Sequence, residues 1–185
     1  MLPLISVTFC AGLNPFATLV IVGVAVGAGL GLNDNVAPDL NFAVQRVFLV
    51  PIVVLLGVDI VLDKLPGTYV VWGKVTFLGR MAGGGLAGGI VGSDSFGIAP
   101  AIFVGTVIAL VATVLRGLVI RKMSERFYGL ERLAIGASSD TIAVLTVLAT
   151  VFSELLGLAI TLLVALAGAW VLLRRSSQRR ETNRL

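Results

Sequence analysis

The first 32 residues contain the feature that most limits what this chain can fold into. From Leu2 to Leu32 there is no charged residue. About 20 mostly apolar residues in a helix cross the hydrocarbon core of a bilayer, so this run is longer than one membrane span. Charged residues make up 13% of the chain, whereas soluble domains carry about 25%. We therefore predict an integral membrane protein rather than a soluble enzyme, a disordered chain or a disulfide scaffold.

Four further apolar runs follow the first. They are Val47–Leu62 with Asp59, Val75–Gly92 with Arg80, Ile98–Ile120 with Arg116, and Ala134–Leu173 with Asp140 and Glu154. As a single helix the last run would be about 60 Å long, twice the thickness of the hydrocarbon core. We therefore predict that it turns near Ser153, Glu154 and Gly157. The predicted fold class is all-α: a polytopic membrane helix bundle with about six transmembrane helices and a broken first helix.

The basic residues predict an orientation. The net charge is +4, and the Lys and Arg residues stand beside apolar runs, which indicates membrane orientation by the positive-inside rule rather than nucleic-acid binding. Six crossings would place all but one of the 14 basic residues inside, with Arg46 outside. We expect one transmembrane domain (1–173), a basic cytoplasmic tail (174–185), and both termini on the cytoplasmic side of the cell inner (cytoplasmic) membrane. Membrane lipids are the expected partners, and a homo-oligomer is left open.

Residue types that carry most enzyme chemistry are scarce. The chain has one cysteine, Cys10, and no histidine, which removes the commonest general base and the commonest transition-metal ligand. No nucleophile motif or cluster of metal ligands stands out. We therefore expect no cofactor, no metal and no catalytic activity.

The break in the first run is predicted at Gly12-Leu13-Asn14-Pro15. Proline removes a helical donor and disfavours helix in the residue before it. In membranes, broken helices occur where protein or a water-filled cavity satisfies the freed backbone groups, and in transporters they often form solute sites. The alternative is that Asn14-Pro15 caps the first true span near the membrane surface.

Two acids, Asp59 and Asp63, stand four residues apart and would share one helix face. Ionisable residues within spans usually face an interior or a cavity, so the two carboxylates would bind a cation or relay a proton. The alternative is structural pairing of either acid with Lys64, Lys74 or Arg80.

Three further charges have simpler alternatives. Arg80 begins the third span and would serve as a positive-inside anchor. Ser138-Ser139-Asp140 precedes an apolar run, which favours a helix N-cap for Asp140. Glu154 falls at the predicted external turn. The residues that we expect around a polar centre for substrate or ion binding are Asn14, Asp59, Asp63, Lys64, Arg80 and Glu154.

Glycines recur at a spacing of four. Gly23 and Gly27 form one such pair, and Gly84 and Gly88 form another. This small-xxx-small spacing lets helices approach closely, so we predict helix packing for these four residues. The alternative is the wall of a conduit with exposed backbone.

Three segments together resemble a known family. Ala11-Gly12-Leu13-Asn14-Pro15, Asp63-Lys64-Leu65-Pro66-Gly67 and the small-residue run Arg80–Gly92 occur in this order. They resemble the prokaryotic domain-of-unknown-function family 4126, whose members are small integral membrane proteins. The resemblance covers most of residues 1–92 and implies the membrane architecture, but it implies no activity.

The leading functional hypothesis is a small transporter or channel-like protein for an ion, a small solute or a lipid. Three spans followed by three would make a 3+3 inverted repeat, as in many transporters, with Asn14-Pro15 and Ala99-Pro100 at corresponding starts. The alternative is a non-catalytic membrane scaffold or assembly partner that packs through its glycine-rich helix faces.

Overall fold

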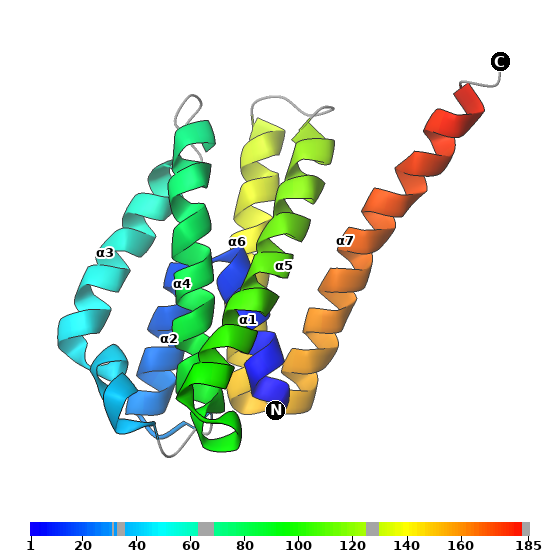
Figure 1. Ribbon diagram of the computed structural model, residues 1–185. Helices are drawn as coiled ribbons and strands as arrows, with labels where there is room; N and C mark the ends of the chain where they lie inside the picture. The colour runs from blue at the N-terminus through cyan, green and yellow to red at the C-terminus, as the bar shows by residue number, and fades with distance from the viewer. Residues whose placement is uncertain (31, 33–35, 63–68, 125–129, 183–185) are drawn as a thin grey trace.

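The computed structural model describes residues 1–30, 32, 36–62, 69–124 and 130–182. Within this part of the chain every regular element is a helix, so the predicted all-α class is confirmed (Figure 1). The elements are α1 (Leu2–Leu13), α2 (Pro15–Gly27), the 3-10 helix η1 (Pro38–Val44), α3 (Arg46–Leu62), α4 (Tyr69–Phe96), α5 (Ile98–Ser124), α6 (Leu130–Phe152) and α7 (Glu154–Thr182).

The charge-free first run folds as a hairpin of two short helices. α1 has 12 residues and α2 has 13, so each is about 18–20 Å long, too short to cross a bilayer core of about 30 Å. Along α1 the neighbours on α4 change from Gly92 beside Leu4 to Gly88 beside Thr8. Pro15, at the tip, lies against Gly83, midway along α4. The hairpin therefore enters the bundle from one end and turns back at its middle.

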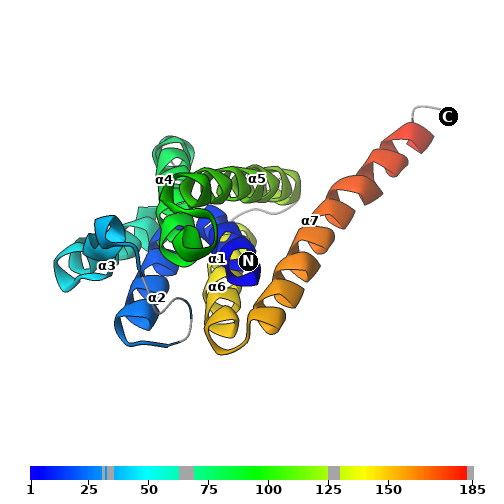
Figure 2. The ribbon, with the colours of Figure 1, turned by 60° about the horizontal axis from the view of Figure 1, so that its bottom comes forward.

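The start of α1 and the end of α7 lie at opposite ends of the bundle (Figure 1). α3 to α7 run alternately up and down through its length, while α1 and α2 occupy only its lower half (Figure 1). Figure 2, which brings the lower end forward, shows the N-terminus there and the last turn of α7 far from it. The described first run therefore forms a half-length hairpin rather than a full-length span, and the prediction of six transmembrane helices with both termini on one side is not confirmed.

The composition of the helices supports a membrane location in part. Two described helices are long and apolar enough to cross a membrane, Ile98–Met123 and Glu154–Leu173, and η1 with α3, bent by 50°, would make a third. Large apolar side chains are also exposed on several helices, as a lipid-facing surface requires. Examples are Val54, Leu78, Phe103, Val111, Leu155, Leu163 and Leu166.

Small residues bring α1, α4 and α5 into backbone contact. A Cβ atom on Gly84 would collide with Ala109 of α5, and one on Gly88 would lie 2.7 Å from the Ala101 carbonyl oxygen. Gly12 likewise packs directly on Ala109 and Ala112. The first glycine pair serves a different contact, because a Cβ on Gly23 would lie 2.5 Å from the Leu49 side chain of α3.

The second half of the chain turns where the sequence predicts. α6 ends at Phe152 and α7 begins at Glu154, and the Ser153 hydroxyl lies 3.4 Å from the backbone N–H of Leu156 in the first turn of α7. α7 then leans away from the bundle toward its C-terminal end (Figures 1 and 2). It continues through Leu173 to Thr182, so the predicted boundary at 173/174 falls inside a helix.

The predicted inverted repeat receives no support from its two marker sequences. Pro15 lies at the hairpin tip, midway along α4. Ala99-Pro100 lies in the first turn of α5, directly after the turn at Gly97 that follows α4. One proline is therefore at the middle of the bundle and the other at its end.

Candidate functional site

Asn14 forms the tip of the α1–α2 hairpin. Its backbone is extended, with φ −144° and ψ 101°, because the following Pro15 disfavours helix at this position. Its side-chain oxygen accepts a hydrogen bond from the Ala17 N–H at 3.0 Å, so Asn14 is the N-cap of α2. The predicted break and cap are both present, but they lie at the centre of the bundle rather than near its surface.

The amide of Asn14 also connects the hairpin to α6. Its Nδ2 donates a hydrogen bond to Asp140 Oδ1 at 3.1 Å. The same carboxylate oxygen lies 3.9 Å from Nη2 of Arg116 on α5, and Arg116 Nε donates to Ser139 Oγ at 2.9 Å. We call these four residues, Asn14, Arg116, Ser139 and Asp140, the tip cluster.

Two members of the tip cluster, Asn14 and Arg116, are buried, and Ser139 and Asp140 are partly buried. The side chains of Arg116 and Asp140 are 7% and 15% exposed, and Asn14 is 1% exposed. Asp140 lies midway along α6. Charged groups at such a depth require partners, and a guanidinium, a carboxylate and an amide supply them to one another.

The protein also satisfies backbone left open by the helix break. Because the helix breaks at Asn14, carbonyls at the end of α1 lose their helical donors. The Thr113 hydroxyl of α5 lies 3.0 Å from the Gly12 carbonyl oxygen and 2.7 Å from that of Ala109. The break is therefore supported by α5 and α6, as irregular backbone inside a membrane requires.

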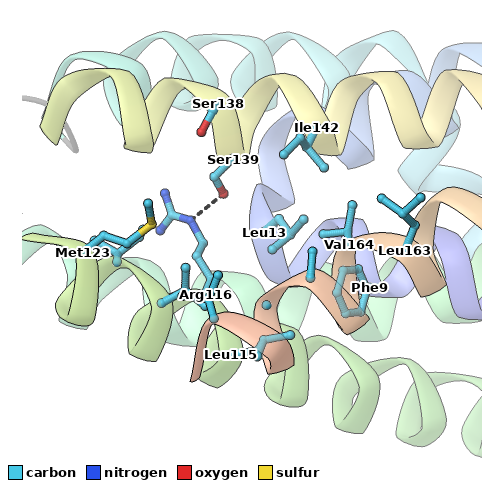
Figure 3. A pocket seen from close by; sticks show the side chains of 15 residues that line it. Phe9, Leu13, Leu115, Arg116, Met123, Ser138, Ser139, Ile142, Leu163 and Val164 are labelled. Atoms are coloured by element: carbon cyan, nitrogen blue, oxygen red, sulfur yellow. Dashed lines mark hydrogen bonds between the residues drawn. The ribbon is translucent and has the colours of Figure 1, made fainter. Parts of the chain in front are cut away.

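A cavity of about 330 Å³ adjoins the tip cluster. It lies between α5, α6 and α7, with α1 contributing Phe9 and Leu13 (Figure 3). Its lining is mostly apolar, but Arg116 crosses from α5 toward Ser139 on α6 and forms a polar wall. Beyond this wall, the Lys122 ammonium donates to the Leu172 carbonyl and joins α5 to α7.

The structure brings one of the predicted site residues, Asn14, into this cluster. Asp59 is buried on α3 and accepts a hydrogen bond from the Trp72 indole at 2.8 Å, a contact between α3 and α4. Arg80 is also buried, on α4 one turn from Gly83. Glu154 is exposed at the start of α7, at one end of the bundle, whereas the tip cluster lies at its middle. Asp63 and Lys64 lie outside the described residues.

Sequence reasoning missed Arg116, Ser139 and Asp140. The N-cap prediction for Asp140 is wrong because α6 begins at Leu130, which places Ser138 to Asp140 well inside the helix. The signal that would have found the pair was in the sequence: Arg116 is the one charge in its apolar run and Asp140 is one of two in its own, and charges within apolar runs indicate an interior site.

The comparisons with known proteins agree with the resemblance in the sequence. No curated protein and no solved structure matches the chain. The profile of a domain of unknown function, DUF4126, matches residues 1–174. The match covers both halves of the hairpin, all five long helices through Leu173 and every residue of the tip cluster. The chain belongs to the DUF4126 family.

Proposed function

We propose that the protein is a small membrane transporter whose solute site is centred on the tip cluster. The observation that carries the proposal is the hydrogen bond between Asn14, at the tip of a half-length hairpin, and Asp140, midway along α6. Half-helices that end at the membrane midplane beside ionisable residues are a recurrent way to build a transport site.

The distribution of charge supports a membrane orientation for this bundle. Lys74, Arg121 and Lys122 lie at the end where α7 finishes, while Asp39, Asp94 and Glu154 lie at the end where the chain starts. Two described exceptions are Arg46, at the start of α3, and Asp59, near the end of α3 (Figure 1). By the positive-inside rule the C-terminal end is cytoplasmic. Five helices, α3 to α7, then cross the membrane, and the hairpin enters from the opposite side.

The chemistry of the cluster suits a solute with charge. Arg116 and Asp140 are opposite charges, and the distance from Arg116 Nη2 to Asp140 Oδ1 is 3.9 Å, longer than the 2.7–2.9 Å or so of a charge-assisted hydrogen bond. Each also has a neutral partner, Arg116 with Ser139 and Asp140 with Asn14. An ion or polar group that reaches the cluster exchanges contacts with groups already positioned for it.

The scaffold alternative rests on glycine-rich helix faces that would pack against a partner protein. Gly84 and Gly88 pack against α5 of the same chain, and Gly23 packs against Leu49. These glycine faces are filled within the bundle, so they are not available to a partner protein.

Water must reach a transport site, which cysteine accessibility tests without knowledge of the solute. In a Cys10→Ala background, Ser139→Cys places a thiol in the tip cluster, and Thr146→Cys places one two turns away on the same helix, where the residue is buried. A membrane-impermeant, cationic methanethiosulfonate should modify Ser139→Cys and leave Thr146→Cys unmodified. A Ser139→Cys thiol that stays unmodified from both faces of the membrane contradicts a hydrated site.

Charge movement tests transport itself. Proteoliposomes on a solid-supported membrane are challenged in turn with sodium, potassium, chloride, acetate and octanoate. We expect a protein-dependent current with at least one of them, and a loss of about tenfold in Asp140→Asn but not in Glu154→Gln, whose carboxylate is exposed far from the cluster. Currents no larger than those of protein-free liposomes for all five contradict the proposal.

A further inference from the structure

We propose that the cavity between α5, α6 and α7 is a binding site for a single-chain amphiphile with an anionic headgroup, such as a medium-chain fatty acid. This inference names a substrate class for the proposed transporter, and it rests on that proposed function for the transport of the bound molecule. Binding itself is a separate property with its own test.

The lining of the cavity divides into two chemically different parts. Phe9, Leu13, Leu163 and Val164 gather at the end near α1, together with Ile142 (Figure 3). These side chains have no hydrogen-bond donors or acceptors. This part of the cavity therefore suits a hydrocarbon chain.

The other part carries positive charge and hydroxyl groups. Arg116 lies across it with its guanidinium directed toward Ser139, and Ser138 and Met123 lie on the same side (Figure 3). A guanidinium presents five donors in a plane that matches a carboxylate in bidentate geometry. Asp140, whose Oδ1 lies 3.9 Å from Arg116 Nη2, is not among the described residues that line the cavity, so an anionic headgroup in the cavity approaches Arg116 rather than Asp140.

Size and access favour one acyl chain over other occupants. The volume of about 330 Å³ is near the lower end of the ~300–1,000 Å³ range of small-molecule sites, too small for a phospholipid with two chains. A small inorganic anion would leave the apolar part of the cavity unfilled. A neutral hydrocarbon would place apolar atoms against the Arg116 guanidinium. The exposed side chains of Leu163 and Leu166 on α7 place this cavity beside the lipid phase, from which an amphiphile enters.

Photolabelling in lipid nanodiscs tests the site. The probe is dodecanoate with a diazirine at its terminal carbon, and labelled peptides are mapped by mass spectrometry. We expect saturable labelling of the segments around Phe9–Leu13 and Leu163–Val171, displaced by unlabelled dodecanoate but not by dodecanol or dodecyltrimethylammonium. Displacement by dodecanol as effective as that by dodecanoate overturns the anionic headgroup.

Three variants keep the proposal falsifiable. Arg116→Gln should reduce saturable labelling by at least about tenfold. Ala167→Trp fills the cavity from α7 and should also abolish labelling, whereas Leu166→Trp, its neighbour with an exposed side chain, should not. Labelling spread evenly over lipid-facing residues such as Val107 and Val111, and equal in all variants, overturns the site.

The two proposals fail separately. Specific labelling without octanoate current leaves a binding site in a protein that does not transport this class of molecule. Current carried by sodium or chloride with no specific labelling leaves a transporter and removes the amphiphile.

Discussion

The two faces of α5 are packed in opposite ways. Toward α4 and α1 it presents Ala101, Gly105 and Ala109, and the helices meet backbone to backbone. Toward α6 and α7 it presents Leu115, Arg116 and neighbouring large residues, and a cavity remains. Small residues fix the distance between helices because little can rearrange, whereas long side chains leave room that a ligand can use. One helix therefore joins a rigid frame to an adaptable site.

The largest expected effect on stability concerns Arg116 and Asp140, the charges beside the face of α5 that is directed toward α6 and α7. Arg116→Met and Asp140→Asn each remove one member of the ion pair inside the bundle, which costs up to about 3–5 kcal/mol. The double variant restores neutrality and should cost at least about 1 kcal/mol less than the sum. Unfolding in mixed micelles, followed by circular dichroism, measures all three. Strictly additive losses would show that the two charges do not stabilise each other.

The second effect tests the close-packed face. Gly84→Leu places side-chain atoms where Ala109 stands, so α4 and α5 must separate, at a cost of about 2–3 kcal/mol or a fall in Tm of about 4–12 °C for a chain of this size. Gly117→Leu on α5 is the matched control, because nothing lies within 4 Å of the position that a Cβ atom would take there. Equal Tm values for the two variants would contradict tight packing at Gly84.

A smaller effect divides the two roles of Asn14 where the faces meet. Asn14→Ala removes both the cap on Ala17 and the donor to Asp140, for a loss of about 2 kcal/mol. Asn14→Ser keeps a capping oxygen and should lose about 1 kcal/mol. Thermal unfolding of both variants separates the contribution of the helix cap from that of the hydrogen bond to Asp140. A serine variant as unstable as the alanine variant would show that capping contributes nothing.

The smallest effect has the opposite sign. Ala167→Leu adds apolar atoms to the cavity and should raise stability by about 1 kcal/mol, or about 2–4 °C in Tm. The same enlargement at Gly84 destabilises, so the pair of variants contrasts the two faces of α5 directly. A fall in Tm for Ala167→Leu would mean that the cavity is not open space.

Much of this architecture follows from the sequence alone. The break at Asn14-Pro15 and the turn at Ser153 were predictable because proline and run length act locally. The hairpin was not, because a chain of 31 uncharged residues fits equally well one span with a short extension or two half-length helices. Only the contacts of Leu4, Thr8 and Pro15 with successive glycines of α4 decide between them.

The candidate site was harder to predict than the fold. Asn14 was identified from its local motif, but its partner Asp140 is 126 positions away. Ser138-Ser139-Asp140 has the pattern of an N-cap, and only the start of α6 at Leu130 removes that role. Arg116 and Arg80 each look like orientation signals until their burial is known.

The hairpin is the claim on which the site and both proposals depend, and the sidedness of the two termini tests it most directly. In a Cys10→Ala background, cysteines replace Leu2 and, separately, Ser177. A membrane-impermeant maleimide is applied to intact and to permeabilised cells. We expect Leu2→Cys to react in intact cells and Ser177→Cys to react only after permeabilisation. Reaction of both from the same side would mean that the first run crosses the membrane, and would contradict the hairpin.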